Sequence, residues 1–140
     1  MSVITSDFMA ARADLIARPG FGPSRRHALT GLTDDWLAGL FTASGAAQLG
    51  CTLVAIGGFG RGELAPASDI DLLLLHPASV SAAEVANVAD RIWYPVWDTG
   101  LRLDHSVRTP AQARRLAGQD LRVVLGLLDA RTVVGDEDRK

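Results

Sequence analysis

Apolar and polar positions divide the N-terminal part of the chain into two helical segments. Residues 6–18 carry apolar side chains at loose helical spacing, and the segment ends in a proline- and glycine-rich loop at residues 18–23. A second helix is predicted over residues 33–48, with Thr33 as its N-cap. Its buried stripe would consist of Trp36, Leu37, Leu40 and Phe41. Both helices are expected to serve packing rather than chemistry.

Three apolar or alternating segments further along predict strands. Residues 51–56 are rich in β-formers, and the glycine pair that follows predicts a central strand ending in a tight turn. Residues 69–76 predict a second buried strand, which Pro77 ends. Residues 101–108 alternate between two faces. The apolar face carries Leu101, Leu103, His105 and Val107, and the polar face carries Arg102, Asp104, Ser106 and Arg108.

Helix-capping signals show where further helices begin. Residues 81–84 match a capping box, which starts a helix that is expected to end at Pro95. A second capping box at residues 109–112 begins helical segments that extend to about residue 129. A short strand at residues 132–134 completes the pattern. This alternation predicts an α+β fold, a small mixed sheet of three to four strands backed by helices.

Length and composition indicate one ordinary globular domain. The 140 residues are expected to form a single unit, with N-terminal helices at 1–48 and a catalytic sheet with helices at 51–135. A composition of 48% hydrophobic and 21% charged residues excludes a disordered or fibrous chain. The single cysteine, Cys51, is interpreted as a buried strand residue, and it rules out an internal disulfide.

The charge balance bears on partners and location. A net charge of -2 provides no overall attraction to nucleic acid or to an anionic membrane, so neither is expected as a partner. Any polyanionic ligand must therefore be bound locally, with the help of a metal. Neither a signal-peptide pattern nor a membrane-spanning apolar stretch is found in the sequence, so a cytoplasmic protein is expected.

The most informative stretch is a glycine turn followed by two carboxylates. It reads Gly-Gly-Phe-Gly-Arg-Gly-Glu-Leu from Gly57 and Gly58 onward, and Asp-Ile-Asp opens the next apolar strand. Alternate residues of a strand point to the same side, so Asp69 and Asp71 can converge on a hard cation while Ile70 turns to the core. Because two carboxylates in an apolar strand repel each other, magnesium carrying a nucleoside triphosphate is the expected counter-charge.

Simpler interpretations apply to each half of this motif taken alone. A diglycine after a strand is more often a plain turn than a phosphate cradle, and an isolated Asp-x-Asp is equally weak. The conjunction of strand, diglycine, short loop and Asp-x-Asp favours the functional interpretation. It is neither a P-loop, since no Gly-Lys-Ser/Thr follows, nor a Rossmann fingerprint, since Glu63 stands where the third glycine would be.

The stretch from residue 57 to residue 73 resembles the signature of the DNA polymerase β-like nucleotidyltransferases. Together with Leu-Asp-His-Ser-Val-Arg-Thr at residues 103–109, it is similar to the bacterial PII uridylyltransferases, weakly at residues 25–41 and clearly at residues 54–135. The resemblance implies a polymerase β-like palm. It also implies that the chain is a fragment of a longer enzyme with a helical region, a phosphohydrolase domain and glutamine-sensing domains.

The resemblance further implies a set of site residues. Asp104 would be a third metal ligand or a base beside Asp69 and Asp71, with Mg²⁺ as the ion and Mn²⁺ as its alternative; its structural alternative is pairing with Arg102 or Arg108. Gly57 and Gly58 would leave room for the β- and γ-phosphates. Arg61 and Ser68 would bind phosphate, or would instead hold the loop through Glu63 and cap the turn. Other candidates are interpreted as structural: surface or loop residues at His27 and His76, a hydrogen-bonded core histidine at His105, and packing of a helix end by Trp93, Tyr94 and Trp97.

The function implied is transfer of UMP from UTP to a tyrosine of the PII signal protein, with release of pyrophosphate. One alternative is transfer of AMP from ATP to PII, because 13 arginines and one lysine indicate a GC-rich genome, where some similar enzymes attach AMP. Another is transfer of AMP to glutamine synthetase, because the glutamine synthetase adenylyltransferases share the diglycine, Ser-Asp-Ile-Asp and later aspartate pattern. The residues after Asp104 favour the PII-modifying group over the glutamine synthetase group. A third hypothesis, of another class, is a non-catalytic module for sensing nucleotides or binding a partner. The isolated domain is expected to be folded but weakly active.

Overall fold

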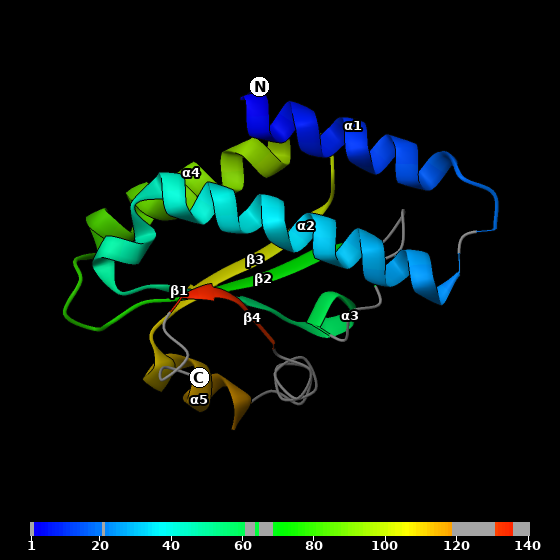
Figure 1. Cartoon of the computed structure of the whole chain (residues 1–140). Coiled ribbons are helices and arrows are strands. Elements are labelled where there is room, and N and C mark those ends of the chain that lie inside the picture. The colour runs from blue at the N-terminus through cyan, green and yellow to red at the C-terminus, as the bar shows by residue number, and fades with distance from the viewer. Residues whose placement is uncertain (1, 21, 61–63, 65–68, 119–130, 136–140) are drawn as a thin grey trace.

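The computed structural model describes residues 2–20, 22–60, 64, 69–118 and 131–135 (Figure 1). Its helices in chain order are α1 (Val3–Ala17), α2 (Pro23–Ser44), the 3-10 turn η1 (Ala46–Leu49), α3 (Gly57–Gly60), α4 (Ala82–Asp98) and α5 (Pro110–Ala117). Its strands are β1 (Thr52–Ala55), β2 (Ile70–Leu75), β3 (Leu103–Arg108) and β4 (Arg131–Gly135). The predicted α+β class is confirmed.

The strands form one mixed sheet of four, in the order β3-β2-β1-β4. Strand β1 runs antiparallel to both β2 and β4, whereas β2 and β3 are parallel and are connected through α4. The two interior strands are almost wholly buried, while β3 at the edge is half-buried or exposed along its length. The buried central strands predicted at residues 51–56 and 69–76 are thus present, over the slightly shorter ranges of β1 and β2.

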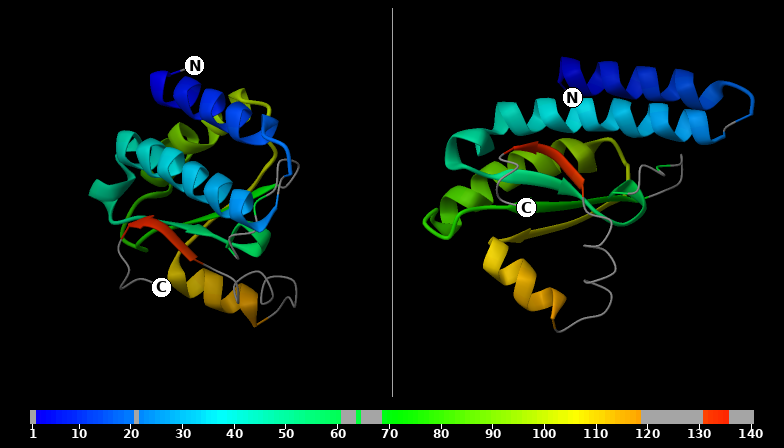
Figure 2. Two further views of the ribbon diagram at one scale, coloured as in Figure 1. Left: turned by 45° about the vertical axis from the view of Figure 1, so that its right-hand side comes forward. Right: turned by 60° about the horizontal axis from the view of Figure 1, so that its bottom comes forward.

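Helices cover both faces of the sheet, but unequally. Helices α1, α2 and α4 lie on one face, and α5 lies on the other (Figure 1 and Figure 2). The larger core lies under α1, α2 and α4. It includes the stacked rings of Phe8 and Trp36, whose centroids are 4.0 Å apart. A smaller cluster of Val54, Leu73 and Leu75 packs against Ala113 of α5. Because alternate residues of β2 face opposite sides, Ile70 and Leu72 enter the larger core.

The second helix begins ten residues earlier than predicted from Thr33. It starts at Pro23 after the N-cap Gly22, and proline at the first helical position leaves no hydrogen bond unmade. Thr33 lies inside the helix, where its hydroxyl donates to the Leu29 carbonyl at 2.7 Å. A threonine can satisfy its hydroxyl on the preceding turn in this way, so the N-cap assignment was wrong. The helix ends at Gly45, whose φ is 87°.

Helix α4 also differs from its prediction, at its C-terminal end. It continues through Pro95 to Asp98, so proline does not end it. Trp93 and Val96 on either side are buried in the larger core, and this packing outweighs one missing backbone hydrogen bond in the last turn. At its N-terminus, the Ser81 hydroxyl accepts from the Glu84 amide at 3.2 Å, as expected of an N-cap.

The structure contains the predicted start of α5 and the predicted last strand. Thr109 and Gln112 form both hydrogen bonds of a capping box at the start of α5. Cys51 is buried directly before β1, and β4 contains the strand predicted at residues 132–134. The helical prediction up to residue 129 lies partly outside the described residues. Among the helices that the structure describes, none is long and apolar enough to cross a membrane.

Candidate active site

The parallel pairing of β2 with β3 places Asp71 beside Asp104. Their Cα atoms are register partners, and both residues occupy positions that alternate with residues of the larger core. Both side chains therefore lie on the face of the sheet that α5 covers. Asp69 precedes β2 by one residue, is exposed, and shares the Asp71 side of the chain. The register therefore brings Asp71 next to Asp104, with Asp69 just before β2.

Electrostatics couples these carboxylates. The pKa of Asp71 is raised to about 6, first because burial disfavours its charged form, and then because the charges of Asp104 and Asp69 oppose its ionisation. A raised carboxyl pKa means that the charged form is held at a cost, which a bound cation would relieve. Asp71 is the half-buried member of the set, while Asp69 and Asp104 are exposed.

Gly57 has a structural reason to be glycine that the sequence did not reveal. Its φ is 60°, and a Cβ at this position would lie only 2.8 Å from Oδ2 of Asp71. The adjoining amide of Ile56 donates to the Asp71 carbonyl at 3.1 Å, which brings the turn against the strand. The predicted tight turn is in fact the one-turn helix α3, which contains Gly58 as well. The bare backbone of Gly57 therefore gives the Asp71 carboxylate its space.

The donor chemistry of the site fits a hard divalent cation. Three carboxylates supply only oxygen ligands, which are those that Mg²⁺ and Mn²⁺ prefer. The space that a Cβ at Gly57 would fill keeps one Asp71 oxygen accessible. As their side chains stand, no three His, Cys, Asp or Glu residues within the described ranges close around a single point. Rotation of the exposed Asp69 and Asp104 side chains would be needed to complete such a site.

Several predicted site residues cannot be placed. Arg61, Glu63 and Ser68 lie outside the described residues. Asp104 is exposed on β3, as its structural alternative of a solvated strand residue expects, but no ion pair joins it to Arg102 or Arg108 within the described part of the chain. Arg108 instead donates to the Val107 carbonyl at 2.8 Å.

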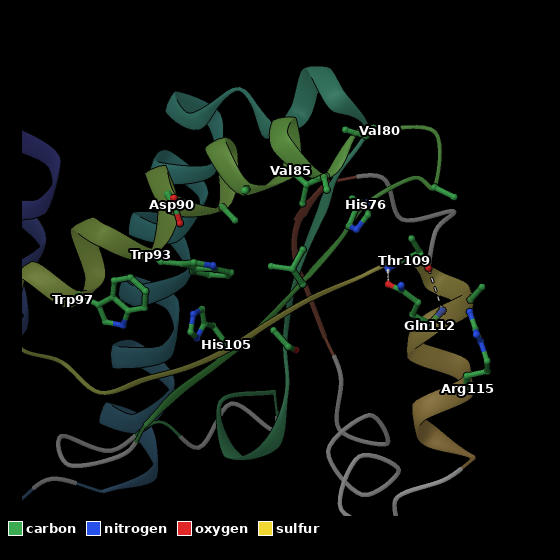
Figure 3. Close-up of a pocket in the computed structure, with 17 residues that line it drawn as sticks. His76, Val80, Val85, Asp90, Trp93, Trp97, His105, Thr109, Gln112 and Arg115 are labelled. Atoms are coloured by element: carbon green, nitrogen blue, oxygen red, sulfur yellow. Dashed lines mark hydrogen bonds between the residues drawn. The ribbon is translucent and has the colours of Figure 1, made fainter.

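The aromatic residues lie apart from the carboxylates, beside a groove of about 930 Å³ between α4, β3 and α5 (Figure 3). His105 makes edge contacts with Trp93 and Trp97, at centroid distances of 5.1 and 5.2 Å. Trp93 is buried packing, as predicted, whereas Tyr94 and Trp97 are 57% and 41% exposed. The prediction of a core histidine at residue 105 was wrong, because β3 is an edge strand and leaves His105 exposed.

Comparison with known proteins finds a family match over the segment that contains these carboxylates and the glycine turn. The nucleotidyltransferase domain family matches residues 47–125, which is more than half of the chain and includes β1 to β3. Relatives that match more than nine-tenths of this chain carry the name bifunctional uridylyltransferase/uridylyl-removing enzyme. The protein from Streptomyces coelicolor is 61% identical over 130 residues, which make up 92% of this chain and 15% of that protein.

Two further relatives are more distant. The protein from Mycobacterium tuberculosis H37Rv is 41% identical over 148 residues, covering 94% of this chain and 17% of the relative. The protein from Burkholderia orbicola AU 1054 is 42% identical over 133 residues, covering 93% and 15%. The chain thus spans 15–17% of the length of these relatives. With the carboxylates and the glycine turn in place, these matches show that the chain belongs to the nucleotidyltransferase domain family.

Proposed function

We propose that this chain is the transferring domain of a longer cytoplasmic enzyme that moves UMP from UTP to a tyrosine of the PII signal protein. Two findings support the proposal: the site geometry, and the name shared by relatives that match nearly the whole chain. The observation that carries it is the register of Asp71 with Asp104, because it brings carboxylates from two strands to one place.

In the proposed reaction, the tyrosine oxygen forms a bond to the α-phosphorus of UTP while the bond to pyrophosphate breaks. Asp69, Asp71 and Asp104 would hold Mg²⁺. When bound, the ion would neutralise phosphate charge and lower the pKa of the tyrosine hydroxyl. Asp104, exposed beside Asp71, is the candidate acceptor of the phenolic proton. Gly57 keeps the turn close to Asp71 without obstructing its carboxylate. Catalysis then consists mainly of positioning and charge stabilisation.

A nucleotide-sensing module without catalysis is a weaker hypothesis for this site. Such a module needs no crowded carboxylates, and Asp71 is held here with a raised pKa, first because of burial and then because of its acidic neighbours. A carboxyl group with a raised pKa is typical of functional sites, and here a bound cation would stabilise its charged form.

The transferred nucleotide is the open choice within the proposal. AMP transfer remains the alternative, because phosphate and metal ligands do not distinguish one base from another. In addition, the arginine-rich, lysine-poor composition is typical of GC-rich genomes, where some similar enzymes attach AMP. The test is a competition of UTP against ATP with the full-length enzyme and PII, followed by intact-mass measurement of PII. A mass increase of one UMP is expected. An increase of one AMP would replace UTP by ATP, and no modification by either nucleotide would contradict the proposed transfer.

A further inference from the structure

We infer that Arg131, anchored by Asp34, is a positioning residue that holds the glycine turn of the active site in place. Arg131 opens β4, Asp34 lies in the middle of α2, and the turn is α3 between β1 and β2. The inference rests on the proposed function, since it concerns how the same site is assembled.

The Arg131 guanidinium contacts two segments at once, α2 and α3. Its Nη1 and Nη2 donate to the two carboxylate oxygens of Asp34, at 2.5 and 3.3 Å. Nη2 also donates to the Phe59 carbonyl at 2.9 Å, and Nε donates to the Gly60 carbonyl at 3.3 Å. The guanidinium carbon lies 5.3 Å from the centre of the Phe59 ring. This planar, five-donor group is therefore used on both a carboxylate and the turn.

The two carbonyls that Arg131 binds are the last two of α3. A helix of four residues makes almost no hydrogen bonds of its own, and here the Gly60 amide reaches back to the Ile56 carbonyl at 3.0 Å. Carbonyls in the last turn of a helix generally lack partners within the helix and accept hydrogen bonds from donors elsewhere. Arg131 supplies these donors. Because α3 begins at Gly57, which contacts Asp71, the position of α3 sets the spacing between the turn and the catalytic carboxylate.

The sheet register explains how Arg131 reaches the turn. Its Cα is paired with that of Ala55, the last residue of β1, so its side chain starts beside the strand end from which the turn departs. Phe59 is almost completely buried and fixes the turn from the core side. Arg131 and the buried Phe59 ring thus both hold α3 in place.

The Arg131 pair differs from an ordinary surface ion pair. Side-chain exposure is 32% for Arg131 and 24% for Asp34, against 59% and 73% for the pair Arg18–Asp14 on α1. Burial raises the pKa of Asp34, while the hydrogen bond and charge of Arg131 act to lower it. A partly buried ion pair adds little net stability once the cost of desolvating both charges is counted. We therefore assign this pair the role of fixing the orientation of the Arg131 guanidinium.

The test uses the full-length enzyme with Arg131→Met, Arg131→Lys and Asp34→Asn. Asp35→Asn is the control, because Asp35 is the exposed neighbour of Asp34 on the same helix. In Arg131→Met and Asp34→Asn, we expect the KM for UTP to rise about tenfold with a smaller fall in kcat, because the phosphate-binding turn shifts. The KM for PII should be unchanged in these variants. The control Asp35→Asn should have the same kcat and KM values as the wild type. Arg131→Lys should restore part of the affinity, since lysine can bind one carbonyl but cannot bridge to Asp34.

Two further measurements keep the outcome decisive. Equilibrium binding of a non-hydrolysable UTP analogue should weaken about tenfold in the same variants, which tests the inference even if the wild type fails to modify PII. Hydrogen exchange at the Gly60 amide should accelerate in Arg131→Met, which reports the turn directly. Variants that remain folded and bind the analogue within twofold of the wild type would overturn the inference. If Arg131→Met does not fold, the isosteric Asp34→Asn decides by the same criterion.

Discussion

The two ends of strand β2 serve opposite purposes. From Leu72 to Leu75 every side chain is buried, and the residues divide between the two cores of the domain. At the other end, Asp71 is a half-buried carboxyl group with a pKa raised by burial and by two acidic neighbours, and Asp69 precedes the strand in solvent. The apolar end therefore supplies buried packing, whereas the acidic end holds carboxylates at a cost in stability that the proposed function would explain. Substitutions at the two ends should therefore have opposite signatures.

The largest expected effect is the loss of transfer at the acidic end. Asp71→Ala and Asp69→Ala in the full-length enzyme should each lower kcat/KM by roughly a thousandfold, because several kcal/mol of metal-assisted charge stabilisation are removed. The fold should remain intact. Nucleotide-transfer assays with labelled UTP, together with circular dichroism, check both statements. Retention of more than about a tenth of wild-type activity by both variants would exclude these carboxylates as metal ligands.

Leu74→Ala should produce the opposite signature at the apolar end. Leu74 is fully buried in the larger core, so its truncation should lower the free energy of unfolding by about 2–5 kcal/mol. The activity of the molecules that remain folded should be close to that of the wild type. Urea denaturation of the 140-residue chain measures the stability, and Ala83→Gly on an exposed position of α4 provides a mild comparison. Equal stability of Leu74→Ala and the wild type would mean that this end is not the stabilising one.

Gly57→Ala should affect both ends of the comparison, because it touches the carboxylate and strains the backbone. The added Cβ would lie 2.8 Å from the Asp71 carboxylate at a φ of 60°. We expect a loss of about 1–2 kcal/mol in stability and a fall in transfer of at least tenfold. Gly100→Ala is the matched control, since Gly100 has a φ of 80° but no neighbouring atom within 4 Å of its Cβ position. If Gly57→Ala and Gly100→Ala both lose stability but keep full transfer activity, the closeness of residue 57 to Asp71 has no functional role.

The smallest expected effect is a pH dependence of stability without divalent cations. The pKa of Asp71 rises from an ordinary value of 3.8 to about 6 on folding, so the folded state binds this proton more tightly than the unfolded state. The associated stability is present below pH 4 and is lost as the pH rises to about 6. After allowance for solvent screening, it amounts to about 1–2 kcal/mol. Urea denaturation in EDTA should show this decline in the wild type but not in Asp71→Asn, and identical profiles would contradict the assigned shift.

Local patterns in the sequence predicted most of the architecture. The two buried strands, the capping box at Thr109 and the Asp-x-Asp motif could be read from neighbouring residues, because strand alternation and helix capping are local properties. Thr33 and Pro95 misled the prediction of helix ends, because core packing and a hydroxyl bond to the preceding turn outweighed local preference.

Long-range features could not be predicted in this way. The contact of Arg131 with Asp34 spans 97 positions of the chain and depends on the register of β4 against β1. A charged residue at the start of a short strand gives no indication of such a partner. The edge position of β3, which exposes His105, likewise depends on strand order rather than on alternation. The contact of Gly57 with Asp71 becomes apparent only when the turn folds back onto the strand.

Binding of Mn²⁺ to the 140-residue chain, followed by electron paramagnetic resonance, tests the central claim most directly. The central claim is that Asp69, Asp71 and Asp104 together hold the divalent cation. With a non-hydrolysable UTP analogue present, the wild type should bind Mn²⁺ at least about tenfold more tightly than Asp71→Asn or Asp104→Asn. Asp35→Asn should match the wild type. Equal Mn²⁺ affinity in the wild type and in both carboxylate variants, including no binding by any of them, would contradict the account.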